Sequence, residues 1–224
     1  MDDCCGPEGS AEYAEVFDER FARGVARRYR RRGLTRTARL IVDYAESADP
    51  AGVSGASVLE VGGGVGEIQL ELLSRGAGHA VNLELSPGYE SEAARLIAEA
   101  DVADQVTRRV GVDIAREPAR VEPADIVVLH RVVCCYPDVD QLLAAAANHA
   151  KRLVVFSYPA ATWFARMSVG MSNFFIRRSG RTYQGYVHSP EHMLRILRRQ
   201  GFELRKRQRG LVWSVVAAAR TATS

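Results

Sequence analysis

The sequence predicts an α/β fold in which a doubly wound, seven-stranded sheet is parallel except for one reversed strand. Three observations predict it: short apolar strands alternate with amphipathic helices, a glycine-rich turn follows the first strand, and very few residues join the last two strands. At 224 residues, the chain suits one domain with an extension. We expect an N-terminal helical extension over residues 1–50 and a main domain over 51–224, with a cap insertion at about 159–188 between strands five and six.

The first 50 residues carry a helical pattern. Apolar side chains recur at helical spacing between Tyr13 and Ala48, beside a run of arginines, and Gly33 predicts a break into two helices. The interrupted apolar stripe consists of Phe17, Phe21, Val25, Tyr29, Leu40, Ile41 and Tyr44. We expect this stripe to pack on the main domain.

Strand and helix patterns alternate from residue 57 onward. The first strand, Ser57–Val61, leads through a glycine-rich turn into a helix at Ile68–Arg75, which makes the first half of a βαβ unit. Further strands are predicted at Ala80–Leu85, Val106–Val112, Asp125–Leu129 and Leu153–Tyr158, and further helices at Pro87–Ala100 and Asp138–Ala150. Right-handed crossovers between such strands build a parallel sheet.

The alternation stops after the fifth strand. Residues 159–188 are too many for a simple connection and are rich in aromatic residues. Because open α/β sheets bind ligands at the carboxyl ends of their strands, we expect this segment to be a mobile apolar lid that selects the ligand. A helix at Pro190–Gln200 then precedes strands at Phe202–Arg207 and Leu211–Ala218. Only Gln208–Gly210 join these two strands, so they must be antiparallel.

Composition and charge exclude several classes of protein. Apolar residues make up 47% and charged residues 25%, and no run of about 18 apolar residues could span a membrane. The N-terminal MDDCCGPEGS lacks the apolar core of a secretion signal, so we expect a cytoplasmic protein. Residues 40–150 hold 7 basic and 18 acidic side chains, whereas 151–210 hold 13 and 2. The basic segment either meets an anionic partner or forms a solvated surface, and we favour the solvated surface.

The four cysteines form two adjacent pairs, Cys4–Cys5 and Cys134–Cys135. This spacing matches no zinc motif, and a reducing cytosol disfavours structural disulfides. Neighbouring cysteines on a strand or turn are expected to point apart. We therefore expect unpaired thiols and no metal site.

The stretch Val58–Gly66 carries the most informative chemistry. A strand that ends in Gly-x-Gly-x-Gly can turn sharply into a helix and lets a ligand approach the backbone amides at the helix N-terminus. Glu67 stands where a dinucleotide fingerprint has Gly or Ala, and a negative charge there argues against NAD. Glu60 suits a cationic group instead, and Glu84, 20 residues after Gly64, suits the hydroxyls of a ribose.

Four stretches carry a family resemblance. Over about residues 55–158, the chain resembles the class I S-adenosylmethionine-dependent methyltransferases. The resemblance lies in the order and spacing of VLEVGGGVG, VNLELSPGY, GVDIA and DIVVLHRVVCCYPD. The reversed seventh strand of that Rossmann-like fold fits residues 190–218. More loosely, ARRYRRRG and VxxCYPD resemble the bacterial magnesium-protoporphyrin and ubiquinone-biosynthesis O-methyltransferases. The resemblance implies S-adenosyl-L-methionine as the cofactor.

The resemblance also implies how the amino acid portion of the cofactor is held. Glu60 and the backbone amides of Gly62, Gly64 and Gly66 would bind it. The chain departs from the family pattern at Gly63, where Cys or another small residue is common. We expect this departure to add flexibility and to remove no ligand.

The same pattern assigns the nucleoside and methyl ends of the cofactor. Glu84 would bind the ribose, and Leu85 would lie against the adenine. Asp113 would accept from the adenine amino group, and Ile114 would offer its backbone amide to the ring. His130 follows the fourth strand, where the family lines the methyl end of the cofactor.

Residues for the acceptor and for proton transfer follow from the chemistry of methyl transfer. A nucleophile attacks the sulfonium methyl in line, so the protein aligns and desolvates the reactants and adds a base if the acceptor is a neutral hydroxyl. The candidate bases are His130 and His188, because an ordinary histidine pKa lies near neutrality. Tyr136 is a candidate to orient the acceptor, and Trp163 and Phe174 are candidates to cap it.

Several function classes remain open. The leading hypothesis is methyl transfer to a small or amphipathic acceptor, at oxygen by preference, with no nucleic acid partner. The alternatives are an RNA or protein methyltransferase that uses the Arg-rich later segment, and a non-catalytic interaction module that retains the fold. His130-Arg-Val-Val replaces the motif that nucleobase amino methylation uses. Asp138 and Asp140 come too late to be the metal ligands of a catechol-type enzyme, so we expect no Mg²⁺, and nothing in the sequence sets the oligomeric state.

Overall fold

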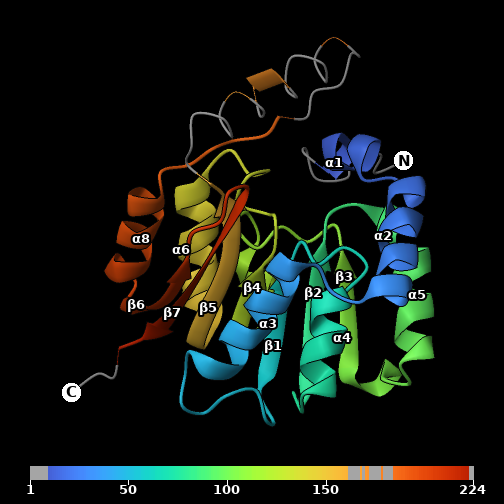
Figure 1. Ribbon diagram of the computed structural model, residues 1–224, viewed down its shortest axis with the longest axis horizontal. Helices are drawn as coiled ribbons and strands as arrows, with labels where there is room; N and C mark the ends of the chain where they lie inside the picture. The colour runs from blue at the N-terminus through green and yellow to red at the C-terminus, as the bar shows by residue number, and fades with distance from the viewer. Residues whose placement is uncertain (1–9, 161–166, 168–169, 172–177, 179–183, 222–224) are drawn as a thin grey trace.

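One seven-stranded sheet organises the protein, as the sequence predicted (Figure 1). The computed structural model describes residues 10–160, 167, 170–171, 178 and 184–221. The strands are β1 (Ser57–Val61), β2 (His79–Glu84), β3 (Val106–Val110), β4 (Ala124–Leu129), β5 (Ala150–Pro159), β6 (Phe202–Gln208) and β7 (Trp213–Arg220). Their order is β3-β2-β1-β4-β5-β7-β6, and β7 is antiparallel to both of its neighbours. The predicted reversed strand is confirmed.

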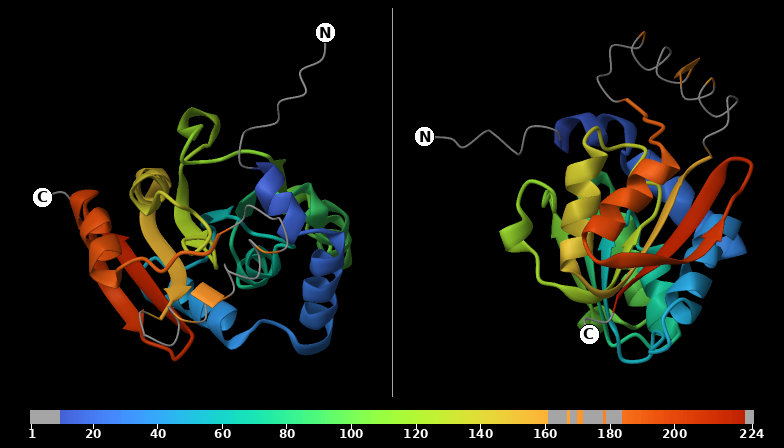
Figure 2. Two further views of the ribbon diagram at one scale, coloured as in Figure 1. Left: turned by 90° about the horizontal axis from the view of Figure 1, so that it is seen from above. Right: turned by 90° about the vertical axis from the view of Figure 1, so that its left-hand side faces the viewer.

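Helices cover both faces of the sheet (Figure 2). They are α1 (Ser10–Val16), α2 (Glu19–Arg32), α3 (Arg36–Ser47), α4 (Glu67–Ser74), α5 (Glu90–Glu99), α6 (Val139–His149) and α8 (Pro190–Arg199). Apolar residues of α3 and α4 pack on one face, and those of α6 and α8 pack on the other. The chain therefore forms the helix–sheet–helix layers of a doubly wound fold.

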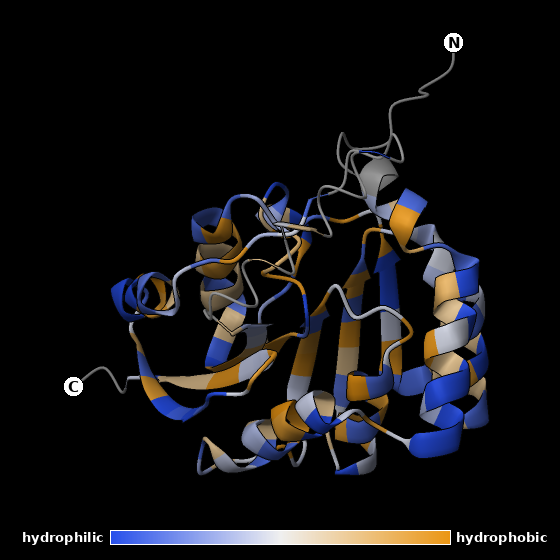
Figure 3. Ribbon diagram, turned by 45° about the horizontal axis from the view of Figure 1, so that its top comes forward, coloured by the Kyte–Doolittle hydropathy of each residue, from blue (hydrophilic) through white to orange (hydrophobic). Residues whose placement is uncertain are grey.

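The two hydrophobic cores arise from the alternation of side chains along the strands. Val58 and Ile126 belong to the core under α3 and α4, whereas the next residues, Leu59 and Val127, belong to the core under α6 and α8. Figure 3 shows the apolar strands inside and polar residues on the outer surfaces of the helices. Strands buried on both faces read as continuous apolar runs, which is why the sequence identified them.

The N-terminal stretch forms three helices, so the prediction of two helices was wrong. The break at Gly33 is confirmed, but a second break lies at Asp18, whose side chain accepts a hydrogen bond of 2.8 Å from the amide of Phe21. Such an N-cap starts a new helix. Ala22 and Ala26 of this helix are fully buried and pack near Tyr89.

Several predicted boundaries also differ from the structure, and two of them concern how an element begins. The helix predicted from Pro87 begins as a 3-10 turn, Pro87–Tyr89, before α5. The last strand begins at Trp213, because Leu211 and Val212 belong to the turn of the hairpin and are exposed. The start of β7 lies beside the carboxyl end of β5, where Trp213 pairs with Pro159.

Most of the predicted cap insertion, including Trp163 and Phe174, lies outside the described residues. Within that segment, the structure describes exposed side chains at Met167 and Met171. Of the helices that the structure describes, none combines the length and the apolar character needed to cross a membrane.

Candidate functional site

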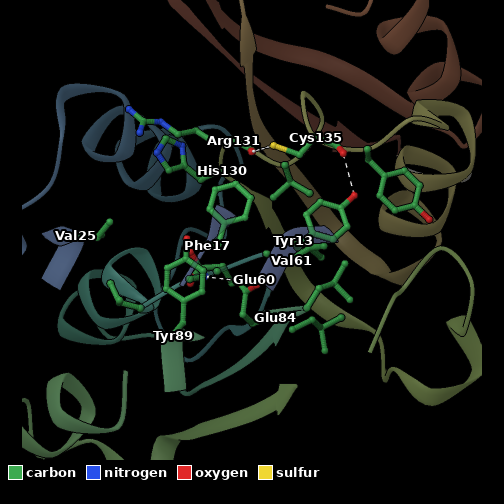
Figure 4. A pocket seen from close by; sticks show the side chains of 18 of the residues that line it. Tyr13, Phe17, Val25, Glu60, Val61, Glu84, Tyr89, His130, Arg131 and Cys135 are labelled. Atoms are coloured by element: carbon green, nitrogen blue, oxygen red, sulfur yellow. Dashed lines mark hydrogen bonds between the residues drawn. The ribbon is translucent and has the colours of Figure 1, made fainter. Parts of the chain in front are cut away.

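A cavity of about 300 Å³ opens at the carboxyl ends of β1, β2 and β4 (Figure 4). Its volume lies within the usual range of small-molecule sites, about 300–1,000 Å³. Parallel strands bring together residues that are far apart in sequence. The predicted site residues that line it are Glu60, Gly62, Gly64, Glu84, Leu85, Asp113, Ile114, His130 and Tyr136. Gly66 and His188 do not line the cavity.

The glycine-rich turn after β1 has the backbone shape that only glycine adopts easily. Gly62, Gly64 and Gly66 have φ values of 62°, 54° and 84°. At Gly63 the reason is different, because a Cβ atom there would lie 2.2 Å from Asn82 Nδ2. The sequence suggested added flexibility for Gly63, and the structure gives a steric reason for the glycine. Close approach of the turn to the buried Asn82 side chain excludes a larger residue.

Glu60 is a buried carboxylate at the cavity wall. Its Oε2 accepts a 3.2 Å hydrogen bond from the amide of Gln69. Burial, and then the nearby negative charge of Glu67, raise the pKa of Glu60 well above its ordinary value. In the described ranges no Lys, Arg or His nitrogen lies within ion-pair distance of this carboxylate. The site therefore favours a ligand that brings a positive charge to Glu60.

Glu84 closes β2 and ties the glycine-rich turn to the neighbouring strand. Its Oε2 accepts from the amide of Gly64 at 2.9 Å, and its Oε1 accepts from the amide of Ser86 at 2.8 Å. Burial raises the pKa of Glu84, and these hydrogen bonds oppose the rise. A carboxylate has about four acceptor positions, so both oxygens keep capacity for a ligand hydroxyl.

Asp113 and Tyr136 form one hydrogen-bonded unit. Asp113 Oδ1 accepts from the amide of Ala115 at 2.9 Å, and Oδ2 accepts from the hydroxyl of Tyr136 at 3.0 Å. Burial, followed by the charge of Asp113, raises the pKa of Tyr136 to about 12. The hydroxyl that we expected to orient an acceptor is thus already donated to Asp113. Leu85 and Ile114 line the cavity beside this pair.

His130 lies at the cavity wall beyond β4. Its Nδ1 is 3.0 Å from the hydroxyl of Ser157, which also accepts from the amide of Arg131 at 2.9 Å. Burial, and then the charge of Arg131, lower the pKa of His130 to about 3. His188, the other candidate base, has its Nε2 3.1 Å from the carbonyl oxygen of Tyr136 and stacks on Tyr186.

The N-terminal helices supply a wall of the cavity that sequence reasoning did not assign. Tyr13, Phe17, Phe21, Val25 and Arg28 all line it. The Tyr13 hydroxyl donates to the carbonyl of Cys135 at 2.9 Å, and the Phe17 carbonyl accepts from the Ser86 hydroxyl at 2.7 Å. The spacing of three and four residues was the available signal, since it places these side chains on one helical face.

The Cys134 and Cys135 thiols converge, and the expectation that they point apart was wrong. Their sulfur atoms are 3.4 Å apart, and each donates to the carbonyl of Arg131 at 3.3 Å. The cause is a tight turn, in which the Cys135 amide donates to the carbonyl of Val132 at 2.8 Å. Cys4 and Cys5 lie outside the described residues. Over the described part of the chain, no three His, Cys, Asp or Glu residues form a group that could hold a metal ion.

Comparisons with known proteins agree with this geometry. The model of a methyltransferase domain family matches residues 25–207. A search among curated proteins gave no significant match.

Solved structures share the fold at low identity. Magnesium protoporphyrin IX methyltransferase from Synechocystis PCC 6803, with bound S-adenosylhomocysteine, is 18% identical with a TM-score of 0.62, over 96% of this chain and 88% of that one. An O-methyltransferase family protein from Burkholderia thailandensis is 16% identical with a TM-score of 0.69, over 95% and 64%. Human N-acetylserotonin methyltransferase with S-adenosylmethionine is 16% identical with a TM-score of 0.63, over 91% and 56%.

Proposed function

Because the chain belongs to the methyltransferase domain family, we propose that it transfers a methyl group from S-adenosyl-L-methionine to an oxygen atom of a small or amphipathic acceptor. The observation that carries the proposal is the convergence of Glu60, the glycine-rich turn and Glu84 on one cavity. Methyltransferases of the same fold that contain the cofactor or its demethylated product support the choice of cofactor.

The residues of the cavity fit each part of that cofactor. Glu60 has a buried carboxylate that no described cation neutralises, which suits the ammonium of the methionine portion. Glu84 keeps acceptor capacity for the ribose hydroxyls, and Asp113 keeps it for the adenine amino group. When bound, the cofactor supplies a methyl group on a positively charged sulfur.

The chain contributes alignment and exclusion of water. Phe17, Phe21 and Tyr89 form an aromatic cluster at the cavity wall, with the rings of Phe17 and Tyr89 stacked at 6.4 Å. Such a wall removes water from the reactants and holds the acceptor near the methyl group. The apolar wall also supports a small or amphipathic acceptor rather than a polymer. Oxygen as the acceptor atom is supported by the O-methyltransferase family protein that shares the fold.

A transfer assay tests the proposal. The purified chain is given methyl-labelled S-adenosylmethionine together with aromatic carboxylic acids and phenols, with total RNA, or with a protein extract. We expect label in the small organic molecules, and loss of this label in Glu60→Gln. Label in RNA or protein would favour those alternatives, and equal background in the wild type and Glu60→Gln would favour a non-catalytic module.

A further inference from the structure

The hydroxyl of Ser157 is the starting point of a further inference, which rests on the proposed function. Ser157 lies on β5 and is fully buried. One side of its oxygen accepts the Arg131 amide at 2.9 Å, and the Nδ1 atom of His130 lies 3.0 Å away. Among the residues that the structure describes, His130 Nδ1 is the one group within reach that can accept the Ser157 proton.

That geometry decides which ring nitrogen of His130 carries the proton. If Nδ1 carried it, Nδ1 would donate to Ser157, and the buried serine hydroxyl would have no acceptor for its own proton, which is a costly arrangement. If Ser157 donates to Nδ1, the serine hydroxyl and Nδ1 are both satisfied, and the ring proton sits on Nε2. The second arrangement is therefore the stable one.

We infer that Ser157 is a positioning residue that fixes His130 as a donor through Nε2, so that the site methylates acceptors whose oxygen is already an anion. Burial and the charge of Arg131 keep the ring neutral, since they lower the pKa of His130 to about 3. A neutral ring that already carries a proton on Nε2 and accepts one hydrogen bond at Nδ1 has no free lone pair with which to act as a general base.

Two of the charged residues at the cavity, both arginines, suit the same class of acceptor. Arg28 and Arg131 both line it, and within the described ranges neither guanidinium has a carboxylate at ion-pair distance. The guanidinium of Arg131 lies over the ring of Trp213 at 5.1 Å. Figure 4 shows His130 and Arg131 together along one wall of the cavity. The charges of both arginines also act on the carboxyl of Glu67, which lines the same cavity, and they oppose the rise that burial causes in its pKa. Beside these two guanidiniums, an N–H donor on His130 suits a carboxylate or an acidic phenol better than a neutral alcohol.

The transfer then needs no proton movement. A lone pair of the acceptor oxyanion forms the new O–C bond while the C–S bond breaks, and the bonding pair stays on sulfur. One negative and one positive charge disappear, so the products are a neutral ester or ether and a neutral thioether. Of the carboxyl groups at the cavity, Glu67 is the one that we do not assign to the cofactor, so it is the base that must be tested against this account.

Nitrogen NMR of histidine reads the tautomer directly. We expect a protonated Nε2 and an unprotonated Nδ1 for His130 between pH 6 and 8, with the signals assigned by their loss in His130→Gln. Ser157→Ala should release the ring into a mixture of tautomers, and Ser157→Thr, which keeps the hydroxyl, should restore the wild-type signals. Ser214→Ala removes another buried serine hydroxyl of the sheet outside the cavity and should change nothing. A proton on Nδ1 in the wild type would overturn the inference.

Ligand binding tests the acceptor class, with 1-naphthoate and 1-naphthylmethanol as matched probes on protein saturated with S-adenosylhomocysteine. We expect the carboxylate to bind about tenfold more tightly or better, and Arg131→Gln to remove most of that preference. Equal affinities, or binding of neither probe, would contradict the anionic acceptor. Failure of S-adenosylhomocysteine itself to bind would instead contradict the proposed function. The tautomer measurement would still stand, because it does not depend on the proposed function.

The pH dependence of kcat/KM separates the acceptor's own ionisation from that of a base. With acceptors of different acidity, the rate should fall below the pKa of each acceptor and show no other step between pH 6 and 8. Ser157→Ala should lower kcat about 10-fold to 100-fold, while the KM for S-adenosylmethionine stays unchanged. A fixed ionisation that disappears in His130→Gln or Glu67→Gln would contradict the account.

Discussion

Individual residues at this site act through partners that lie far away in sequence. Tyr136 has its hydroxyl bonded to Asp113, and His130 has its Nδ1 beside Ser157. The sequence identified Asp113, Tyr136 and His130 as candidates but could not indicate these pairings, because they form only when separate strands are brought together. The pairings change the expected roles, since a hydroxyl proton or a ring-nitrogen lone pair that is already used in a hydrogen bond is no longer available to a ligand.

Replacing Tyr136 with Phe should weaken cofactor binding. The change leaves Asp113 Oδ2 without the 3.0 Å hydrogen bond that orients it, and hydrogen bonds to charged groups are worth about 1.5–3 kcal/mol, so we expect a loss of about tenfold or more in affinity. Titration calorimetry with S-adenosylhomocysteine measures the effect. Tyr158→Phe, which removes the hydroxyl of a buried tyrosine outside the cavity, is the control. An unchanged affinity in Tyr136→Phe would mean that Asp113 does not contact the cofactor.

His130 should make the protein sensitive to acid. Because burial lowers its pKa to about 3, the unfolded chain gains a proton near pH 6.5 while the folded chain does not. Stability is therefore lost as pH falls from about 6.5 toward 3. Between pH 7 and pH 5, the unfolding free energy of the wild type should fall by about 1–2 kcal/mol more than that of His130→Gln. Urea denaturation at both pH values measures this difference, and equal losses would contradict a buried neutral ring.

At the scale of elements, α1 and α2 do more than pack on the sheet. Their apolar stripe was visible in the sequence, and the break at Gly33 was predicted, but the stripe also lines the cavity through Phe17, Phe21 and Val25. Periodicity reports which face of a helix is apolar and not what that face meets. The strands were easier to predict, because residues buried on both sides of a parallel sheet leave continuous apolar runs.

Phe21 is the residue of this wall best placed to act on the acceptor alone. It is 45% exposed although it lines the cavity, so its truncation should cost little stability. We expect Phe21→Ala to lower kcat/KM for the acceptor at least about fivefold, with an unchanged affinity for S-adenosylmethionine. Leu204→Ala, which truncates a similarly exposed side chain on β6, should leave both unchanged. Loss of cofactor binding in Phe21→Ala would show that this helix supports the cofactor instead.

Across the whole molecule, the fold collects the site at one edge of the sheet. The motifs after β1, β2 and β4 are adjacent in the strand order although up to 70 residues separate them in the chain, from Glu60 to His130. The family pattern predicted this assembly from spacing. It could not predict the tight fit of Gly63 against Asn82, which depends on the exact separation of β1 and β2.

The uneven charge of the chain also has a place in the fold. The acidic middle of the sequence builds β1 to β4, and the basic segment builds α8 and β6 at the other end of the sheet. Two of the described arginines there face carboxylates, Arg207 with Glu191 and Arg205 with Glu203, both at 3.8 Å. The pair of Arg205 with Glu203 is exposed, which agrees with a solvated surface.

Titration calorimetry with S-adenosylmethionine tests the central claim most directly, using the wild type, Glu84→Ala, Glu84→Gln and the exposed control Glu203→Ala. The account predicts one binding site per chain in the wild type and in Glu203→Ala. It predicts about tenfold weaker binding or worse in Glu84→Ala, because the ribose loses its charged acceptor, and an intermediate loss in Glu84→Gln, which keeps one oxygen. No binding heat with the wild type, or wild-type affinity in Glu84→Ala, would contradict it.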